Sequence, residues 1–225
     1  MRILSIDTTS NVCSVSILEN DQVIDENILD NGKTHSENMM PLLDELLKRN
    51  NMDISNVEFI SVCVGPGSFT GIRIGIATIK AFAEVLNIKV ASVTSLETLS
   101  RNETAERDQV IVPIIDARNN QVYATVFDNE YNQIEDNMAD DIENVINRIK
   151  KYDNVVFVGN GAIIHKDLIV SYFANSRFSE NNKQYSSKTG ICGYHKLLKN
   201  EVLDADTITP LYLRKSQAER MKNGK

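Results

Sequence analysis

The feature that most constrains the fold of this sequence is a glycine-rich turn that joins an apolar run to a long apolar segment. Residues 59–64 are apolar or small, which is typical of a buried strand. The turn at 65–67, Gly-Pro-Gly, ends that strand, because proline fixes its own φ and glycine can adopt positive φ. Ser68 or Thr70 can then cap a helix, which we expect over about 72–86. The segment therefore predicts a strand, a tight turn and a helix.

The expected helix over 72–86 carries more apolar surface than one sheet requires. Its strongly polar residues, Arg73, Lys80 and Glu84, fall within an arc of roughly 40° on a helical wheel. A helix that covers a sheet needs an apolar stripe only about 100° wide. Two alternatives follow: the helix is buried on nearly all sides, or a second apolar face binds another protein.

A second helix with a broad apolar face is expected over about 34–50. Thr34 and Glu37 have the spacing of a capping box. Pro41 lies inside the apolar pattern, so either the first turn is kinked or the helix begins near Pro41. The remaining segments predict strands over 2–7, 12–18, 22–29, 89–93, 110–116, 121–127, 131–137 and 155–158, and helices over 94–101, 142–151, 163–173 and 188–198.

The composition is that of an ordinary globular protein. At 225 residues, the chain can form one large domain or two small ones. No apolar run approaches the roughly 20 residues of a membrane span, and the N-terminus, with an acid at position 7, lacks the pattern of a signal peptide. Three cysteines without metal-site spacing are expected to be core residues in a reducing compartment. We therefore expect a cytoplasmic protein without membrane contact.

Charge is distributed unevenly along the chain. The net charge is −7, but the stretch from Arg214 to Lys225 has five basic residues and one acid, which leaves −11 for the rest. Nucleic-acid binders usually carry a basic face, so we do not expect this chain to hold a long phosphate backbone alone. The basic tail is either solvated or contacts RNA or an acidic partner.

One pattern of elements occurs twice. In each half a strand ends in an acid, Asp7 or Asp116, and a polar turn, further strands, a helix, a strand, a glycine turn and a helix follow. The glycine turns are at 65–71 and 159–161, and the charged segment 102–109 separates the halves. We therefore predict an N-terminal subdomain over 1–104, a C-terminal subdomain over 105–214 and a basic tail over 215–225.

The repeated layout resembles that of the actin, sugar-kinase and Hsp70 (ASKHA) superfamily. The resemblance implies an α/β fold with two subdomains, each a mixed sheet that starts with a β-meander and has flanking helices. In that fold the two first-turn segments face each other across a nucleotide cleft. Fold alone does not prove activity.

The glycine turn and its flanks also resemble a particular family, TsaB (also called YeaZ). Residues 65–75, Gly-Pro-Gly-Ser-Phe-Thr-Gly-Ile-Arg-Ile-Gly, match its signature letter by letter. Further segments look like family landmarks, in order: 6–9, 34–36 with 41–43, 94–97, 115–118 with 122–123, 159–161 and 210–214. The resemblance covers nearly the whole chain and is weakest at about 128–155 and 175–200.

The resemblance implies a non-catalytic scaffold subunit. TsaB proteins take part in making N6-threonylcarbamoyladenosine in tRNAs that read codons starting with A. They bind and activate the transferase TsaD together with the ATPase TsaE, form homodimers when TsaD is absent, and reach tRNA only through the complex. The resemblance therefore implies an accessory subunit without catalytic residues of its own.

The two broad apolar helices are expected to lie side by side and to form the partner interface with TsaD or a second copy. A four-helix seam of this kind would bring small residues into close approach, namely Gly71, Gly75, Ala77 and Ala81. The alternative is that both helices are simply core. The candidate interface residues are His35, Met39, Leu43, Leu46, Gly71, Arg73, Gly75, Ile76, Ile79 and Lys80.

A nucleotide site is the rival interpretation. Candidate nucleotide contacts are Asp7, Thr8, Thr9, Gly67, Ser68, Asp116, Gly159 and Gly161. If these residues bind magnesium and phosphates, the chain is an ATPase or kinase of the ASKHA fold. If they only form turns, we expect no cofactor, apart from weak contact with ATP or ADP and magnesium at a partner interface. No two of the three histidines are four residues apart, so we expect neither a metal site nor a metallopeptidase centre.

Overall fold

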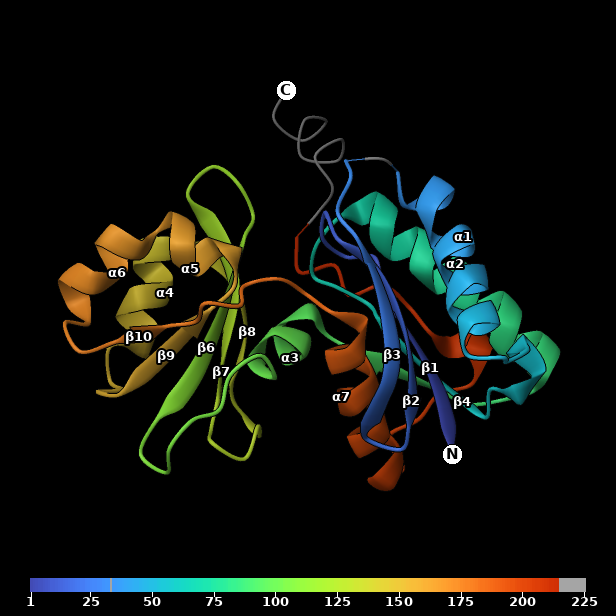
Figure 1. Ribbon diagram of the computed structural model, residues 1–225. Coiled ribbons are helices and arrows are strands. Elements are labelled where there is room, and N and C mark those ends of the chain that lie inside the picture. The colour runs from blue at the N-terminus through green and yellow to red at the C-terminus, as the bar shows by residue number, and fades with distance from the viewer. Residues whose placement is uncertain (33, 215–225) are drawn as a thin grey trace. The chain divides into compact units, whose positions relative to one another are not determined.

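The chain folds into two compact units, which the computed structural model describes over residues 1–32 and 34–214 (Figure 1). Unit 1 comprises residues 1–99 and 183–210, and unit 2 comprises 100–182 together with the stretch from 211 onward. Among the described residues, no helix is both long enough and apolar enough to cross a membrane.

Unit 1 is built on a five-stranded mixed sheet in the order β3-β2-β1-β4-β5. The first three strands form an antiparallel meander, and β4 and β5 add to β1 in parallel. Helices α1 and α2 cover one face of this sheet, and α7 covers the other (Figure 1). The elements are β1 (Arg2–Asp7), β2 (Cys13–Glu19), β3 (Gln22–Leu29), α1 (His35–Arg49), η1 (Ile54–Asn56), β4 (Phe59–Cys63), α2 (Phe69–Leu86), β5 (Val90–Val93), α3 (Ser95–Ser100), α7 (Ser186–Leu198) and η2 (Ala205–Thr207).

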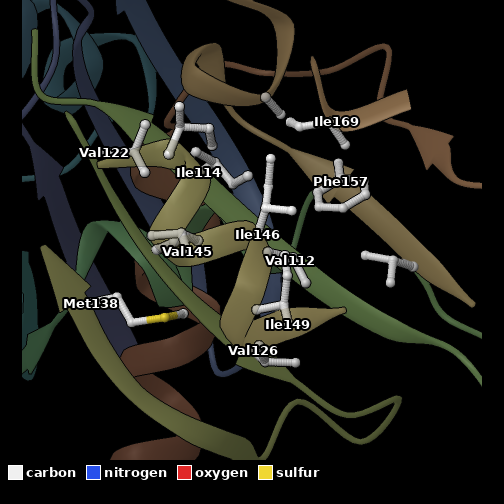
Figure 2. Packing of buried hydrophobic residues seen from close by; sticks show 14 of the residues in the cluster. Val112, Ile114, Val122, Val126, Met138, Val145, Ile146, Ile149, Phe157 and Ile169 are labelled. Carbon is white, nitrogen blue, oxygen red and sulfur yellow. The ribbon is translucent and has the colours of Figure 1, made fainter. Parts of the chain in front are cut away.

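Unit 2 repeats the same strand order, β8-β7-β6-β9-β10, with the same antiparallel and parallel pairings. One face of its sheet packs against α4, whose residues Val145, Ile146 and Ile149 point into a core with Phe157 (Figure 2). The elements are β6 (Val110–Asp116), β7 (Gln121–Phe127), β8 (Gln133–Asp141), α4 (Ile142–Ile149), β9 (Val155–Val158), α5 (Asn160–Ile164), α6 (Lys166–Tyr172) and β10 (Arg177–Phe178). The repeated halves and the α/β class expected from the sequence are confirmed.

The chain passes back into unit 1 before it ends, which corrects the expected C-terminal subdomain of 105–214. Helix α7 packs on β1, β2, β4 and β5, so residues 183–210 belong to unit 1. This packing is close: a Cβ on Gly190 would overlap the Leu18 side chain, and one on Gly193 would overlap Ser61. Leu203 then pairs with Val90 and covers the β5 edge of the sheet.

Three local expectations need correction. Helix α1 begins at His35 with Pro41 inside it, and the Thr34 side chain contacts the Ser36 hydroxyl rather than closing a capping box. The single helix expected over 163–173 is two short helices, α5 and α6, because the chain turns at His165. The segment 175–187, for which the sequence predicted no helix or strand, contains the short strand β10.

Candidate functional site

The glycine turn places the start of α2 directly against the turn between β1 and β2. Gly65 has a φ of +107° and precedes a cis peptide bond to Pro66. Ser68 caps α2, because its hydroxyl accepts the backbone N–H of Gly71 at 3.2 Å. The N–H of Ser68 in turn donates to Thr9 O at 2.7 Å. Of the two capping residues expected from the sequence, Ser68 is the one used.

Helix α2 has two apolar faces. One face is buried in unit 1 and consists of Gly71, Ile72, Gly75, Ile76, Ile79 and Ala83. The other carries Ile74, Ala77, Ala81 and Val85, which we call the α2 strip. Ala77 and Ala81 are exposed, Ile74 is half-buried, and the Val85 side chain is 84% exposed. The surplus of apolar residues seen in the sequence is therefore divided between the core and an exposed strip.

Helix α1 lies beside α2 on the same face of the sheet (Figure 1). Its exposed side contributes Met40, which is 48% exposed, together with Pro41 and Asp44. An apolar surface rimmed by polar residues is a common property of protein-binding sites. The small side chains of the α2 strip would let a partner helix approach closely, since interhelical distance depends on the side chains at the contact.

Burial corrects the expected interface set. Seven of its ten residues lie inside unit 1, because apolar side chains at helical spacing face their own sheet. These are Met39, Leu43, Leu46, Gly71, Gly75, Ile76 and Ile79. These residues are packed inside unit 1, so they are not exposed for contact with a partner.

The other three candidates lie at the edges of the helices. His35 is half-buried and its Nε2 lies 2.8 Å from Ser10 O, while its ring would be within 2.9 Å of a Cβ on Gly71. Lys80 is half-buried and donates to Asp206 O at 2.9 Å. Arg73 is exposed on α2. Of the expected interface residues, Arg73 is the one whose position on the surface suits a partner contact.

The acid at the end of β1 lies in a buried network of hydroxyl groups. Asp7 is 1% exposed, and its Oδ1 accepts the N–H and the hydroxyl of Thr9 at 2.8 and 2.7 Å. The Ser95 hydroxyl donates to Thr9 Oγ1 at 2.9 Å, and the Thr189 hydroxyl lies 3.5 Å from Asp7 Oδ2. Elements β1, α3 and α7 are therefore joined through the Asp7 and Thr9 side chains.

Burial governs the acidity of this cluster. It raises the pKa of Asp7 above its ordinary value, and the hydrogen bonds from Thr9 only partly oppose that effect. Burial also raises the pKa of Cys63, which lies 3.2 Å from Ser95 Oγ, and that of Cys13 to about 11. All three cysteines of the chain are buried without a disulfide. Thiols of raised pKa are poor nucleophiles.

In unit 2 the corresponding residues form a turn of their own. The Asp116 carboxylate accepts the N–H of Arg118 at 3.0 Å, and the Asp116 N–H donates to Asn160 Oδ1 at 3.1 Å. Gly159 has a φ of +104°, and a Cβ on Gly161 would come within 2.9 Å of the β6 backbone. A positive φ accounts for Gly159 and close packing on β6 accounts for Gly161, and nucleotide contact by unit 2 stays a prediction.

Two further expectations can be placed on the structure. No group of three or more histidine, cysteine or acidic side chains among residues 1–32 and 34–214 could hold a metal ion. The basic tail over 215–225 lies outside the described residues.

The expected site missed some of the residues that the structure brings to the surface or into the Asp7 network. Met40 and Val85 were absent from the candidate contacts, although the helical wheel places Val85 outside the buried arc. Ala77 and Ala81 were expected at the close approach of the four-helix seam, and both are exposed. Thr189 was missed because it is 182 residues from Asp7 and no local pattern marks it.

Comparison with known proteins gives one family. A family model described as "TsaD: tRNA N6-adenosine threonylcarbamoyltransferase" matches residues 29–222. The "tRNA threonylcarbamoyladenosine biosynthesis protein TsaB" of Bacillus subtilis is 33% identical, over 97% of this chain and 96% of its own length.

Two solved structures share the fold. YeaZ from Pseudomonas aeruginosa superposes with a TM-score of 0.80 at 22% identity, over 94% of this chain and 99% of its own. The activator of 2-hydroxyisocaproyl-CoA dehydratase from Clostridium difficile, solved with bound ADPNP, has a TM-score of 0.52 at 10% identity, over 94% of this chain and 100% of its own.

Proposed function

Because the chain belongs to the TsaB (YeaZ) family, we propose that it is a non-catalytic subunit in the biosynthesis of tRNA N6-threonylcarbamoyladenosine. In this role it binds a TsaD-type transferase and activates it. The transferase, with a TsaE-type ATPase, performs the chemistry in the cytoplasm. Contact with tRNA is made through the complex, and a homodimer forms when the transferase is absent.

The observation that carries this proposal is the exposed α2 strip, together with the exposed Met40 of the neighbouring helix α1. Val85 exposes 84% of its surface and Met40 exposes 48%, although the same helices also bury a full apolar face in unit 1. Burying such surface against a partner is favourable by about 25 cal/mol per Å². A stable interface needs roughly 800 Å² on each side, a scale that two helices can supply.

The charge of the surface adds specificity. Arg73 and Glu84 are exposed on α2, and Glu37 and Asp44 are exposed on α1, so the two helices carry exposed groups of both signs. Rim charges of this kind influence the association rate and partner choice more than they do affinity. A partner with complementary charges would be selected over other apolar helices.

Reconstitution of the reaction tests the proposal. A TsaC-type enzyme, a TsaD-type transferase and a TsaE-type ATPase from one source are mixed with tRNA, with and without this chain. We expect modified tRNA only when the chain is present, and no ATP consumption by the chain alone. Equal product without the chain, or ATP turnover by the chain alone, would contradict the proposal, the latter in favour of a kinase-like enzyme.

A surface variant sharpens the same assay. Val85→Glu places a charge on the α2 strip and should reduce product formation at limiting concentrations of the chain. Ile164→Glu is the matched control, because Ile164 is 60% exposed and lies on α5 in unit 2. If both variants support wild-type product formation, the α2 strip is not the contact.

A further inference from the structure

The fold implies a nucleotide, and the structure allows a test of whether unit 1 could hold its phosphates and magnesium. The dehydratase activator of similar fold was solved with bound ADPNP. In such a site the first-turn groups of unit 1, Asp7, Thr8 and Thr9, would have to face the ligand. Their contacts show what they face in this chain.

The carboxylate of Asp7 faces the protein interior. Its side chain is 1% exposed, and Oδ1 already accepts two hydrogen bonds from Thr9. Oδ2 faces the Thr189 hydroxyl. Magnesium requires near-octahedral oxygen ligands and keeps several waters, so it cannot be bound by a carboxylate without access to solvent. Asp7 does not fit a magnesium ligand.

The backbone of the turn faces helix α2. Thr9 O accepts the N–H of Ser68 at 2.7 Å, and a Cβ on Gly67 would overlap that carbonyl group. The Thr8 hydroxyl donates to Gly71 O at 2.8 Å, and a Cβ on Gly71 would overlap Thr8 O. The space beside the turn is filled by the helix, so it does not fit a phosphate.

The three glycines of the signature explain this close fit. Gly67, Gly71 and Gly75 follow one another at four-residue spacing, and the last would place a Cβ 2.5 Å from Thr8 Oγ1. Gly71 and Gly75 lie on one side of α2, since residues four apart share a side of a helix, and Gly67 lies in the turn before it. The three glycines therefore form a surface without side chains, onto which the Thr8–Thr9 turn is packed.

We propose that Asp7 is a positioning residue for the partner-binding helix and takes no part in nucleotide binding. Its carboxylate holds Thr9 by two hydrogen bonds, and the Thr8–Thr9 turn then fixes the start of α2. The α2 strip lies on the exposed face of the same helix. Contacts to Ser95 and Thr189 tie the same turn to α3 and α7. The link to partner affinity rests on the proposed function, whereas the link to α2 order does not.

Two roles of the Asp7 side chain can be distinguished: it can act as a hydrogen-bond acceptor or as a negative charge. An asparagine at position 7 would keep the oxygen that accepts both Thr9 bonds, and its NH₂ group could donate to Thr189 Oγ1. Thr189 can accept this bond because its own hydroxyl has alternatives in Thr98 Oγ1 at 2.9 Å and Tyr185 O at 3.4 Å. Asp7→Asn should therefore preserve the network, whereas Asp7→Ala removes it.

Hydrogen exchange and partner titration on the full chain test the proposal. Asp7→Ala should speed amide exchange at residues 69–75 at least tenfold and weaken affinity for the TsaD-type transferase by a similar factor, and Asp7→Asn should restore both. Thr9→Val provides a milder second route, because it removes one of the two bonds to Asp7 and should raise exchange in the same segment. Asp167→Ala, an exposed acid on α6, is the control.

Several outcomes would overturn the proposal. One is unchanged exchange at 69–75 in folded Asp7→Ala and Thr9→Val. Another is binding of magnesium–ATP by the wild-type chain, measured by calorimetry, that folded Asp7→Asn weakens tenfold. If the wild-type chain does not bind the transferase, the proposed function fails while the exchange result still decides the role of Asp7.

Discussion

The hydroxyl of Thr8 donates to the carbonyl oxygen of Gly71 at 2.8 Å, which joins the β1–β2 turn to the first turn of α2. At this point the Gly71 Cα lies so close to Thr8 O that any side chain would overlap the backbone. We predict that Gly71→Ala lowers the free energy of unfolding by about 3 kcal/mol, since overpacking forces backbone shifts. Urea denaturation measures this effect.

A control variant tests whether the loss of stability comes from this overlap or whether any substitution in α2 destabilises the protein. Ala77→Gly, on the exposed side of the same helix, should cost only about 1 kcal/mol through helix propensity. If Gly71→Ala is as stable as the wild type, the close approach to Thr8 does not exist in solution.

The burial of α1 gives a second prediction. Leu46 is fully buried, so Leu46→Ala should lower the free energy of unfolding by about 2–5 kcal/mol through lost burial and a cavity. Met40→Ala, at a side chain that is 48% exposed, should change it by less than about 1 kcal/mol. Thermal denaturation of both variants tests this prediction. If the leucines of α1 faced solvent instead of the sheet, Met40→Ala would lower the melting temperature more than Leu46→Ala.

The raised pKa of Asp7 predicts how stability depends on pH. Because burial raises the folded-state pKa above the ordinary value of 3.8, the folded state favours the neutral carboxyl group. That stabilisation is complete below pH 3.8 and is lost as pH rises through the folded-state pKa. Asp7→Asn should remove this loss, and its free energy of unfolding at pH 7 should equal or exceed that of the wild type.

The measurement is urea unfolding of both proteins across pH 4 to 8. The ionisable groups that influence Asp7 are the thiols of Cys63 and Cys13, whose pKa values are themselves raised and which stay neutral over this range. If the wild-type protein instead becomes more stable relative to Asp7→Asn as pH rises, the pKa of Asp7 in the folded state is lowered and the prediction is wrong.

Helix α7 depends on an acid from a distant strand. Glu26 on β3 accepts the N–H of Ser187 at 2.8 Å and the hydroxyls of Ser186 and Ser187 at 3.0 and 2.8 Å. It thus caps the start of α7 from outside the helix. Glu26→Ala should lower the free energy of unfolding by about 1–2 kcal/mol, as loss of a cap does. Glu19→Ala, at an exposed position on β2, should leave it within about 0.5 kcal/mol.

Local pattern was enough to predict most of the elements. Strand β3 and strand β9 have the predicted bounds, and α2 begins only a turn earlier than expected because Ser68 caps it. The repeat of two mixed sheets could be predicted because each half repeats the same order of short-range signals. These features depend on residues close in the chain, which is where periodicity and turn chemistry operate.

Long-range packing could not be predicted in the same way. Nothing local to Ser186–Leu198 indicates that its partners are β1 and β2 rather than the strands that precede it. The sequence also could not divide the apolar residues of α2 between core and surface, since both faces look alike until the sheet is in place. Ile76 and Ile79 were therefore expected on the wrong face.

Titration of a purified TsaD-type transferase with the wild-type chain and with Ala81→Glu tests the central claim most directly. Ala81 is exposed at the centre of the α2 strip, so the variant should fold normally and carry a charge into the interface. We predict at least 100-fold weaker binding, or about 3 kcal/mol, with an unchanged melting temperature. Wild-type affinity in the variant would contradict the account, because the transferase would then bind elsewhere.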